Sequence, residues 1–263
     1  MANPVGTPIW FELTVKDLEK AQDFYAATVG WTIAPTPMAE HGGYRIANAT
    51  DNLGVAGIMK PPPGMDGVPG WVIHFAADDV DVMAAKVKQL GGAVHFGPMD
   101  IPHVGRFATV ADPQGIVFHL MRGSSPEDSK AFMQMAHGQG GGFGHGVWIE
   151  LTTPDPEAAL EFYGKLFGWS KQGAMPMGDM GDYTFIGTGE DFRPGAMMSS
   201  KTTGGIPRWN MYFHVPDIDK AIATAKAKGG TLMHGPNQIP GGDYSAMVSD
   251  VEGNAVGIVG SRH

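Results

Sequence analysis

The stretch PIWFELTVKDLEKAQDFYAATVGW, residues 8 to 31, returns 138 residues later as GVWIELTTPDPEAALEFYGKLFGW, residues 146 to 169. The same offset aligns GPMDIP at 97 to 102 with GPNQIP at 235 to 240. This agreement covers most of two halves with almost no gap. It therefore predicts that the chain arose by duplication and folds as a tandem repeat.

A segment that belongs to neither copy lies between them. It reads RGSSPEDSKAFMQMAHGQGGGFGH, residues 122 to 145. Ser125 is a good N-cap residue and predicts a short helix at its start, while the glycines at its end are typical of a linker. We predict a first domain at 1–122, a Gly-rich linker at 123–145 and a second domain at 146–263.

Each copy contains the same order of elements twice. Residues 9 to 15 alternate, with Trp10, Glu12 and Thr14 on one face of a strand, and Asp17 caps a helix at 18 to 29. Further strands are predicted around 31–35, 44–49 and 54–59; then follow a strand at 71–76, a helix at 80–90 and strands around 93–96, 105–110 and 116–121. The chain is therefore predicted to be an α+β protein with four βαβββ modules.

Composition excludes several functional classes. The net charge is −9 and no basic run occurs, which argues against nucleic acid and anionic membrane surfaces as partners. The chain has no cysteine, so disulfides and thiolate metal sites are excluded. No stretch is apolar for the roughly 18 residues of a membrane span, and the first residues do not resemble a secretion signal. We expect a cytoplasmic protein.

The phrase "ELT..D...A..FY....GW" and the closing "D..G" before the last strand resemble the glyoxalase/bleomycin-resistance/dioxygenase (vicinal oxygen chelate) superfamily, in its two-repeat, glyoxalase-like branch. The resemblance implies two half-open mixed-sheet barrels with helices outside, each around a concave cleft. It also implies a small-molecule ligand and a monomer or homodimer. Two functions follow: a lyase, isomerase or dioxygenase acting on a small oxygenated metabolite, or a non-catalytic drug-binding protein of the bleomycin-resistance kind.

Members of this superfamily hold a divalent metal through residues of a module's first and last strands. The first-strand positions correspond here to Trp10, Val72, Trp148 and Asn210, and the last-strand positions to His119 and Gly257. Two residues further along the first strands stand Glu12 and His74. Glu12, His74 and His119 together have the composition of a facial triad. They are candidate catalytic residues and ligands of one divalent metal in the first domain. His119 does not share the two-residue shift of Glu12 and His74, which favours a polar cleft without metal, and no metal is expected in the second domain.

Other residues are candidates for contact with the ligand. Trp10 and Trp148 fit stacking on a planar ligand, or else simply fill the interior. Glu150 repeats Glu12, which is either a general base or a hydrogen-bonded structural carboxylate, and Tyr212 takes the place of His74. Arg106, beside His103 in the loop before a strand, fits a carboxylate or enolate oxygen, or else is a solvated surface arginine.

Overall fold

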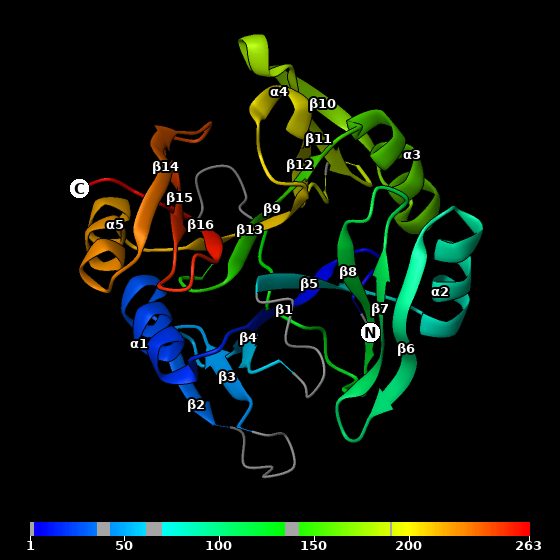
Figure 1. The fold of residues 1–263 in the computed structure, drawn as a ribbon, viewed down its shortest axis with the longest axis horizontal. Helices are drawn as coiled ribbons and strands as arrows, with labels where there is room; N and C mark the ends of the chain where they lie inside the picture. Colours follow the sequence, from blue (N-terminus) through cyan, green and yellow to red (C-terminus); the bar gives the residue numbers. More distant parts are fainter. Residues whose placement is uncertain (1–2, 36–42, 62–69, 135–141, 190) are drawn as a thin grey trace. The chain divides into compact units, whose positions relative to one another are not determined.

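The computed structural model describes residues 3–35, 43–61, 70–134, 142–189 and 191–263. The first repeat contains two modules, and the predicted βαβββ order is confirmed in both (Figure 1). Their elements are β1 (Pro8–Thr14), α1 (Leu18–Val29), β2 (Thr32–Pro35), β3 (Arg45–Asn48) and β4 (Gly54–Met59), then β5 (Gly70–Ala76), α2 (Val80–Gln89), β6 (Ala93–Ile101), β7 (Gly105–Ala111) and β8 (Val117–Gly123).

The second repeat has the same order and contains two further short helices, η2 and α4, whose counterparts in the first repeat fall largely outside the described residues. It contains β9 (Gly146–Thr153), α3 (Pro156–Phe167), β10 (Ser170–Pro176), η2 (Gly178–Met180), β11 (Asp182–Gly187), β12 (Gly195–Ser199) and α4 (Ser200–Thr203), then β13 (Arg208–His214), α5 (Ile218–Ala227), β14 (Thr231–Gln238), β15 (Tyr244–Ser249) and β16 (Ala255–Gly260). The four βαβββ modules of the prediction are therefore all present.

An aspartate begins each of the four long helices. In every case one carboxylate oxygen accepts a hydrogen bond from the backbone N–H three residues further on, at 3.0 to 3.1 Å. This satisfies one of the N–H groups that a helix leaves without a partner in its first turn. The four N-cap residues are Asp17, Asp79, Asp155 and Asp217.

The strands form two mixed sheets, with the orders β2-β3-β4-β1-β5-β8-β7-β6 and β10-β11-β12-β9-β13-β16-β15-β14. Pairs such as β1 with β4 and β5 with β8 are parallel, whereas β3 with β4 and β7 with β8 are antiparallel. Both sheets end in edge strands and are not closed. The predicted α+β class and half-open mixed sheets are confirmed, and β6 is longer than the sequence predicted.

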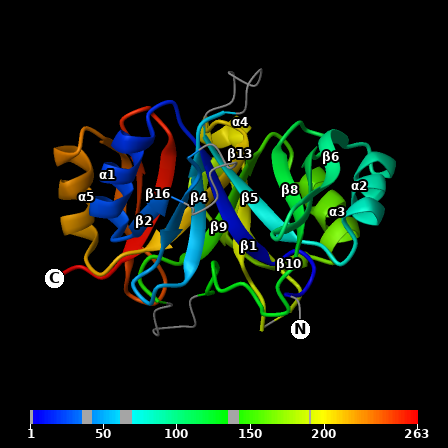
Figure 2. The ribbon, with the colours of Figure 1, turned by 90° about the horizontal axis from the view of Figure 1, so that it is seen from below.

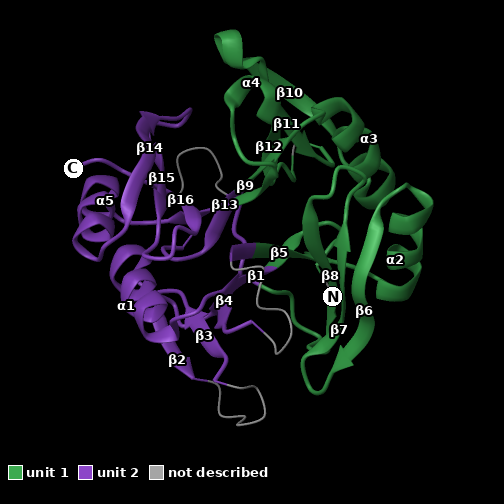
Figure 3. Ribbon diagram, in the orientation of Figure 1, with its two compact units in different colours: residues 1–9, 72–129, 149–210 green, residues 10–71, 130–148, 211–263 purple. Residues whose placement is uncertain are grey.

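Contact between elements divides the chain into two compact units that cross the repeats (Figure 3). Unit 1 comprises residues 1–9, 72–129 and 149–210, and unit 2 comprises 10–71, 130–148 and 211–263. Each unit thus combines one module of the first repeat with one of the second. Within unit 2, α1 lies beside α5, and within unit 1, α2 lies beside α3 (Figures 1 and 2).

A buried chain of three polar side chains links the two modules of unit 2. Trp71 Nε1 donates to the hydroxyl of Tyr25 at 3.1 Å, and that hydroxyl donates to Asp250 Oδ2 at 3.1 Å. The Asp250 Oδ1 atom accepts from the backbone of its own turn at Glu252 and Asn254. The tyrosine and the "D..G" aspartate of the shared phrase are therefore partners across the repeats, and not independent core and turn residues.

Unit 1 contains the same arrangement with the repeats exchanged. Trp209 Nε1 donates to Tyr163 at 3.1 Å, and the Tyr163 hydroxyl donates to Asp112 Oδ2 at 3.2 Å. Burial and the nearby carboxylate raise the pKa of both Tyr25 and Tyr163 well above the usual range, so each stays a neutral donor. The duplication therefore specifies cross-repeat pairing twice, with identical chemistry.

The linker differs from the prediction at its start. Residues 124–134 contain no helix: bends surround Ser125, whose hydroxyl accepts from the Glu127 backbone at 3.1 Å, and Phe132 forms an isolated bridge with Gly146. At its other end His145 is 0 % exposed, with Nδ1 2.5 Å from the Lys130 carbonyl and Nε2 3.1 Å from Asp51. The linker's last residues are therefore fixed. Residues 135–141 lie outside the described part of the chain.

No helix in the described ranges is long and apolar enough to cross a bilayer.

Candidate functional site

Two histidines meet in unit 1. His74 on β5 pairs in parallel register with His119 on β8, so the two side chains leave neighbouring strands on the same face. Nδ1 of His119 lies 2.8 Å from Nε2 of His74, and the rings meet edge to face at 83° with their centroids 4.3 Å apart. The structure therefore brings together two of the three residues predicted as a triad.

Both imidazoles are held neutral. Burial lowers the pKa of His119 to about 4, and burial together with the charge of His119 lowers the pKa of His74 well below its usual range. In a hydrogen bond between two neutral imidazoles, one ring nitrogen donates and the other accepts. The tautomers of the two rings are therefore coupled, because a donating nitrogen on one ring requires an accepting nitrogen on the other, and such a pair can relay one proton.

The second repeat fills the equivalent place differently. Tyr212 pairs with Gly257 in the same register, and a Cβ on Gly257 would lie 2.2 Å from the Tyr212 ring. Only glycine therefore fits beneath this tyrosine. Tyr212 and Gly257 of the second repeat thus take the places of His74 and His119. The second repeat therefore has no pair of imidazole nitrogens at this position.

Glu12 heads a hydrogen-bond chain in unit 2. Trp10 Nε1 donates to the Tyr44 hydroxyl at 3.0 Å, and that hydroxyl donates to Glu12 Oε2 at 2.9 Å. Gly57 of β4 stands opposite Glu12, and a Cβ there would lie 1.7 Å from the Tyr44 hydroxyl oxygen. The missing side chain at Gly57 is what lets Tyr44 reach the carboxylate.

Glu12 is 8 % exposed, and its burial raises the pKa to about 7 against the smaller lowering effect of Tyr44 and Trp10. The pKa of Tyr44 is raised well above its usual range by burial and by the charge of Glu12, so Tyr44 keeps its proton. A carboxyl with a pKa near neutrality is present in both forms at working pH. That is the condition for a group that both takes and returns a proton.

The second repeat has a related cluster in unit 1. The Tyr183 hydroxyl donates to Glu150 Oε2 at 3.0 Å, and Asn210 Nδ2 lies 3.4 Å from Glu150 Oε1 and 3.2 Å from Thr152 Oγ1. Arg208 Nε donates to Asn210 Oδ1 at 2.7 Å. Asn210, one of the first-strand positions of the superfamily, is therefore used to bind neighbouring side chains.

A metal requires more donors than the histidine pair supplies. In the part of the chain that the structure describes, no three His, Cys, Asp or Glu side chains gather closely enough to hold a metal ion. The hydrogen bond between His74 and His119 also occupies one nitrogen of each ring. The two imidazoles as arranged do not fit a chelating metal site. A metal site formed by Glu12, His74 and His119 stays a prediction.

Arg106 lies on the surface beside α2. Its Nε and Nη2 atoms donate to the two oxygens of Asp81 at 2.6 and 2.8 Å, and Nη1 donates to Asp100 at 3.1 Å. These bonds favour the surface interpretation of this arginine over a ligand-binding one. His103 is exposed in the turn between β6 and β7, and its carbonyl accepts from Ser124 at 2.9 Å. Trp148 and Tyr212 are half-buried on β9 and β13.

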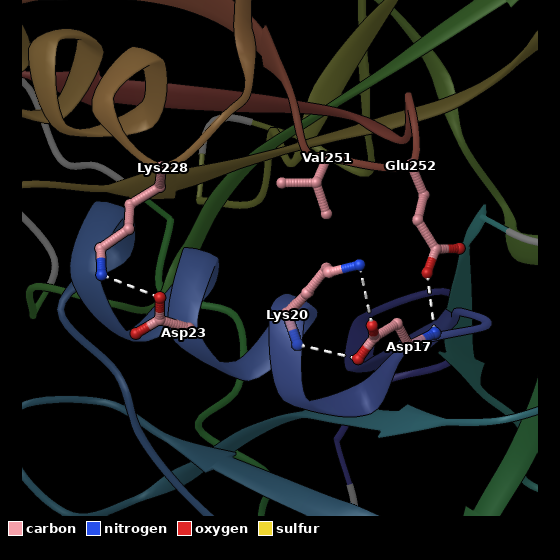
Figure 4. A pocket seen from close by; sticks show the side chains of 6 residues that line it. All are labelled: Asp17, Lys20, Asp23, Lys228, Val251 and Glu252. Atoms are coloured by element: carbon pink, nitrogen blue, oxygen red, sulfur yellow. Dashed lines mark hydrogen bonds and ion pairs between the residues drawn. The ribbon is translucent and has the colours of Figure 1, made fainter.

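A hollow of about 410 Å³ opens on the surface of unit 2, and none of these side chains lines it (Figure 4). Its charges are satisfied locally, because Lys20 lies 3.2 Å from Asp17 and Lys228 lies 2.8 Å from Asp23. Glu252 accepts from the backbone N–H groups of Lys16 and Asp17 at 2.8 to 3.0 Å. This hollow is a junction between α1 and the turn before β16, and it offers no chemistry for the candidate site.

Two tyrosines that hydrogen-bond the repeated glutamates, Tyr44 and Tyr183, were not among the residues predicted from the sequence. Tyr44 directly follows Gly43 and precedes the third strand of its module, and Tyr183 lies two residues after Gly181, at the start of the corresponding strand. A tyrosine recurring at that place in both copies is a signal that was present in the sequence. Its meaning depends on which strand carries the acceptor, which only the sheet order shows.

The comparisons with known proteins agree with this architecture. Residues 7–120 and 145–258 both match the Glyoxalase/Bleomycin resistance protein/Dioxygenase superfamily. The chain belongs to this superfamily. The predicted resemblance is thereby confirmed, in two tandem copies.

Two relatives are similar in sequence to this chain, one over nearly its whole length and one over about half of it. The chain is 31 % identical to the anthracycline biosynthesis protein DnrV of Streptomyces peucetius, over 98 % of this chain and 94 % of that protein. It is 44 % identical to the putative glyoxylase CFP32 of Mycobacterium bovis over 123 residues, which are 46 % of each chain. The first match spans both superfamily copies, and the second spans about half of each chain.

Solved structures show the same fold. The Mn(II)-bound glyoxalase of Novosphingobium aromaticivorans matches 99 % of this chain and 83 % of its own, with a TM-score of 0.67 and 18 % identity. Homoprotocatechuate 2,3-dioxygenase of Arthrobacter globiformis matches 98 % of this chain and 80 % of its own, with a TM-score of 0.68 and 15 % identity. At these identities the superfamily fold is what the likeness shows.

Proposed function

We propose that the protein is an enzyme of the glyoxalase superfamily that acts on a small oxygenated metabolite, with Glu12 as its acid–base residue. The observation that carries this proposal is the chain from Trp10 through Tyr44 to Glu12. It orients one carboxyl oxygen and keeps the group in a buried place where its pKa is about 7.

The supported chemistry is proton transfer at a carbon next to a carbonyl. The Glu12 carboxylate takes the proton, the electron pair of the broken C–H bond forms an enolate, and the Glu12 carboxyl returns the proton to the same carbon or to its neighbour. Such a step gives an isomerase; in a lyase the enolate would instead expel a group from the next carbon, and the Glu12 carboxyl would give its proton to that leaving group. His74 and His119 are proposed as further catalytic residues, because a neutral, mutually oriented imidazole pair can carry the second proton.

The name of one relative supports a class of substrate. A protein of anthracycline biosynthesis shares 31 % of its sequence with this chain over nearly the full length of both. Anthracyclines are polycyclic aromatic ketones, and the half-buried indole of Trp10 lies on the same strand face as Glu12. We therefore propose an aromatic ketone as the substrate, with Trp10 beside its ring.

Exchange of hydrogen for deuterium tests this function without knowledge of the natural substrate. 1-Tetralone, an aromatic ketone with exchangeable hydrogens next to its carbonyl, is incubated in D₂O and followed by proton NMR. The wild-type protein should accelerate exchange over buffer, and Glu12→Gln should lower the rate by about 100-fold. Glu161→Gln, which alters an exposed glutamate paired with Lys165, is the matched control. Equal rates for Glu12→Gln and wild type would refute the role of Glu12.

The second candidate function is binding without catalysis. The observation that favours it is that Trp10 and Trp148 occupy superfamily ligand positions with side chains that cannot bind a metal. In that case a hydroxylated anthraquinone should bind in calorimetry, Trp10→Ala should weaken it, and no deuterium exchange should occur. Trp148→Ala, the equivalent change in the other repeat, shows which tryptophan matters.

The metal set of Glu12, His74 and His119 has its own test. If this set holds a metal, metal analysis of protein purified without chelator will show a stoichiometric divalent ion that disappears in His119→Ala. A wild-type protein that neither retains nor binds added Mn²⁺, Fe²⁺, Ni²⁺ or Zn²⁺ contradicts the set.

A further inference from the structure

A buried histidine at the end of the linker lies between two oxygen acceptors. His145 is 0 % exposed. Its Nδ1 lies 2.5 Å from the carbonyl oxygen of Lys130, and its Nε2 lies 3.1 Å from Oδ2 of Asp51, in the turn between β3 and β4. A carbonyl oxygen and an ionised carboxylate oxygen can only accept hydrogen bonds, so both ring nitrogens have to donate. Opposite an ionised Asp51, His145 is therefore an imidazolium ion.

Asp51 is held in its ionised form. Its Oδ1 accepts from the Leu53 N–H at 3.1 Å, while Oδ2 faces His145. Burial acts to raise the pKa of Asp51, but the hydrogen bonds from Leu53 and His145 outweigh burial and hold this pKa below its usual value. The side chain of Asp51 is also 42 % exposed, so water solvates the carboxylate. Asp51 therefore stays charged at neutral pH whether or not His145 carries its second proton.

The backbone around His145 is bonded to other parts of unit 2. The Thr50 N–H and hydroxyl donate to the Phe143 carbonyl at 3.2 and 3.1 Å, and Trp31 Nε1 donates to the Gly144 carbonyl at 2.7 Å. A neutral imidazole keeps a proton on one nitrogen only, so its other nitrogen would face an oxygen acceptor without a hydrogen bond. Such a buried contact is unfavourable, and it is relieved when residues 142–145 move away from Asp51 and Thr50.

The start of the chain has the same backbone arrangement without a titratable side chain. With the offset of 138 residues, Thr7 of unit 1 corresponds to His145, and Gly189 corresponds to Asp51. The backbone bonds of the two segments match: Gly6 and Thr7 bond to Ala76 at 3.0 and 2.8 Å, and Gly144 and His145 bond to His214 at 2.8 and 3.0 Å. The backbone arrangement thus exists without an ion pair, and His145 with Asp51 is a feature of unit 2.

Two further residues beside His145 carry titratable groups. Lys130 contributes its carbonyl oxygen and is itself exposed. His214, at the end of β13, is 6 % exposed and bonds to the segment through its backbone, and its ring centroid lies 4.7 Å from that of Phe143. A proton on His214 would oppose one on His145, whereas the carboxylate of Asp51 favours it. A test of His145 therefore has to separate it from His214.

We propose that His145 is a proton-dependent latch, in which the imidazolium fastens residues 142–145 to Asp51 and Lys130 and loss of its proton releases them. The open segment holds a neutral histidine above pH 6.5, the ordinary range of this side chain, whereas the closed segment holds the cation. Opening thus releases one proton, so the open fraction should rise about tenfold per pH unit above that range. The latch does not depend on the chemistry proposed for Glu12, and it is tested without substrate.

Amide hydrogen exchange, followed by NMR on the full-length chain, measures the opening. After correction for the faster chemical exchange at higher pH, protection of the Thr50 and Gly144 amides should fall about tenfold per unit between pH 7 and pH 8. The Gly6 and Ala76 amides of the matching segment are the control within the same molecule, and their protection should stay constant. Constant protection at Thr50 and Gly144, or an equal fall at both segments, overturns the proposal.

The proton itself is observed on the imidazole. In nitrogen NMR of the wild-type protein at pH 7.5, both ring nitrogens of His145 should carry a proton, as the two acceptors require. A His145 ring with one unprotonated nitrogen at this pH, in a segment that is still closed, overturns the proposal. This measurement needs no variant, so it does not depend on whether a substituted chain folds.

Two variants identify the groups responsible. Asp51→Asn removes the anion and offers an amide N–H to a neutral Nε2, so residues 142–145 should stay closed with constant protection from pH 7 to pH 8. A tenfold fall per pH unit that persists in Asp51→Asn overturns the latch. His214→Gln removes the neighbouring titratable ring and should leave the fall at Thr50 and Gly144 unchanged. Loss of the fall in His214→Gln would assign it to His214 and overturn the role of His145.

Discussion

His74 and His119 stand opposite each other on adjacent parallel strands, with 2.8 Å between Nε2 of the first and Nδ1 of the second. The equivalent residues of the second repeat are Tyr212 and Gly257, which share the space as a large ring over an absent side chain. Both pairs fill one position of the same fold. The histidine pair of the first repeat has ring nitrogens that can accept or donate a proton. The pair Tyr212 and Gly257 of the second repeat has no side-chain nitrogen.

The pH dependence of stability should reveal the neutral state of His119. Its pKa is lowered to about 4 in the folded protein, below the usual value near 6.5, so the unfolded chain binds more protons between those values. Stability should therefore fall as pH drops from 6.5 towards 4, by on the order of 2 kcal/mol from this residue. When the free energy of unfolding is measured with denaturant at several pH values, His119→Gln should lose less stability than wild type between pH 6.5 and pH 4. An unchanged slope would contradict the burial of a neutral imidazole.

Glu12 should act in the opposite direction. Its pKa is raised to about 7 in the folded state, so the folded protein binds the extra proton between the usual value near 4.5 and 7. The stabilisation that comes from protonated Glu12 is fully present below pH 4.5 and is lost as the pH rises through 7. It amounts to at most about 3 kcal/mol. The difference in unfolding free energy between wild type and Glu12→Gln, measured at pH 5 and pH 8, isolates this effect from that of the histidines. A difference independent of pH would show that Glu12 is not buried as described.

The hydroxyl of Tyr25 should contribute to stability through its two partners. Tyr25→Phe removes the donor to Asp250 and the acceptor for Trp71 while keeping the ring, so two buried polar groups lose a hydrogen bond. We expect a loss of about 1–3 kcal/mol in the free energy of unfolding. Tyr163→Phe, the equivalent change in the other unit, should cost a similar amount. A loss under about 0.5 kcal/mol in both would mean that these bonds are replaced by water.

Gly257 should not tolerate a side chain while Tyr212 is present. A Cβ at this position would lie 2.2 to 2.6 Å from three atoms of the Tyr212 ring. Gly257→Ala should therefore lower the unfolding free energy by about 1–3 kcal/mol through overpacking. Tyr212→Ala removes the ring, and the double variant should lose less than the sum of the two single changes. Strictly additive losses would show that the ring is not the obstacle.

Most of the local structure follows from patterns in the sequence. The alternation around Glu12, the aspartates that cap helices and the glycines that end them are short-range features, and each strand and helix of the modules appears where these predict it. The helix predicted at Ser125 was wrong because residues 127–130 are polar and mostly exposed, and the apolar residues that follow, Ala131 and Phe132, are buried in non-helical backbone, where Phe132 pairs with Gly146. The length of β6 was underestimated because its exposed residues give no apolar alternation.

The candidate site was predictable only in part. His74 and His119 were selected by their places relative to superfamily positions, and the parallel pairing of β5 with β8 makes them neighbours. Tyr44 was missed because its partner Glu12 lies on a strand separated from it by β4, and Gly57 makes the contact sterically allowed. Arg106 was proposed for the ligand because its acceptor Asp81, on a helix 25 residues away, is not visible as a partner in the sequence.

The duplication was visible in the sequence as an offset of 138 residues, and the modules and capped helices as residue types at fixed short spacings. The superfamily was predicted from the resemblance of these repeated phrases. Which side chains contact one another could be learned only from the folded chain. Tyr25 donates a hydrogen bond to Asp250, 225 residues away in sequence, and Tyr163 donates one to Asp112, 51 residues away. Both contacts exist because each compact unit combines modules of different repeats. Hydrogen-bond partners depend on strand order and on close approach through space, and periodicity along the chain carries no information about either.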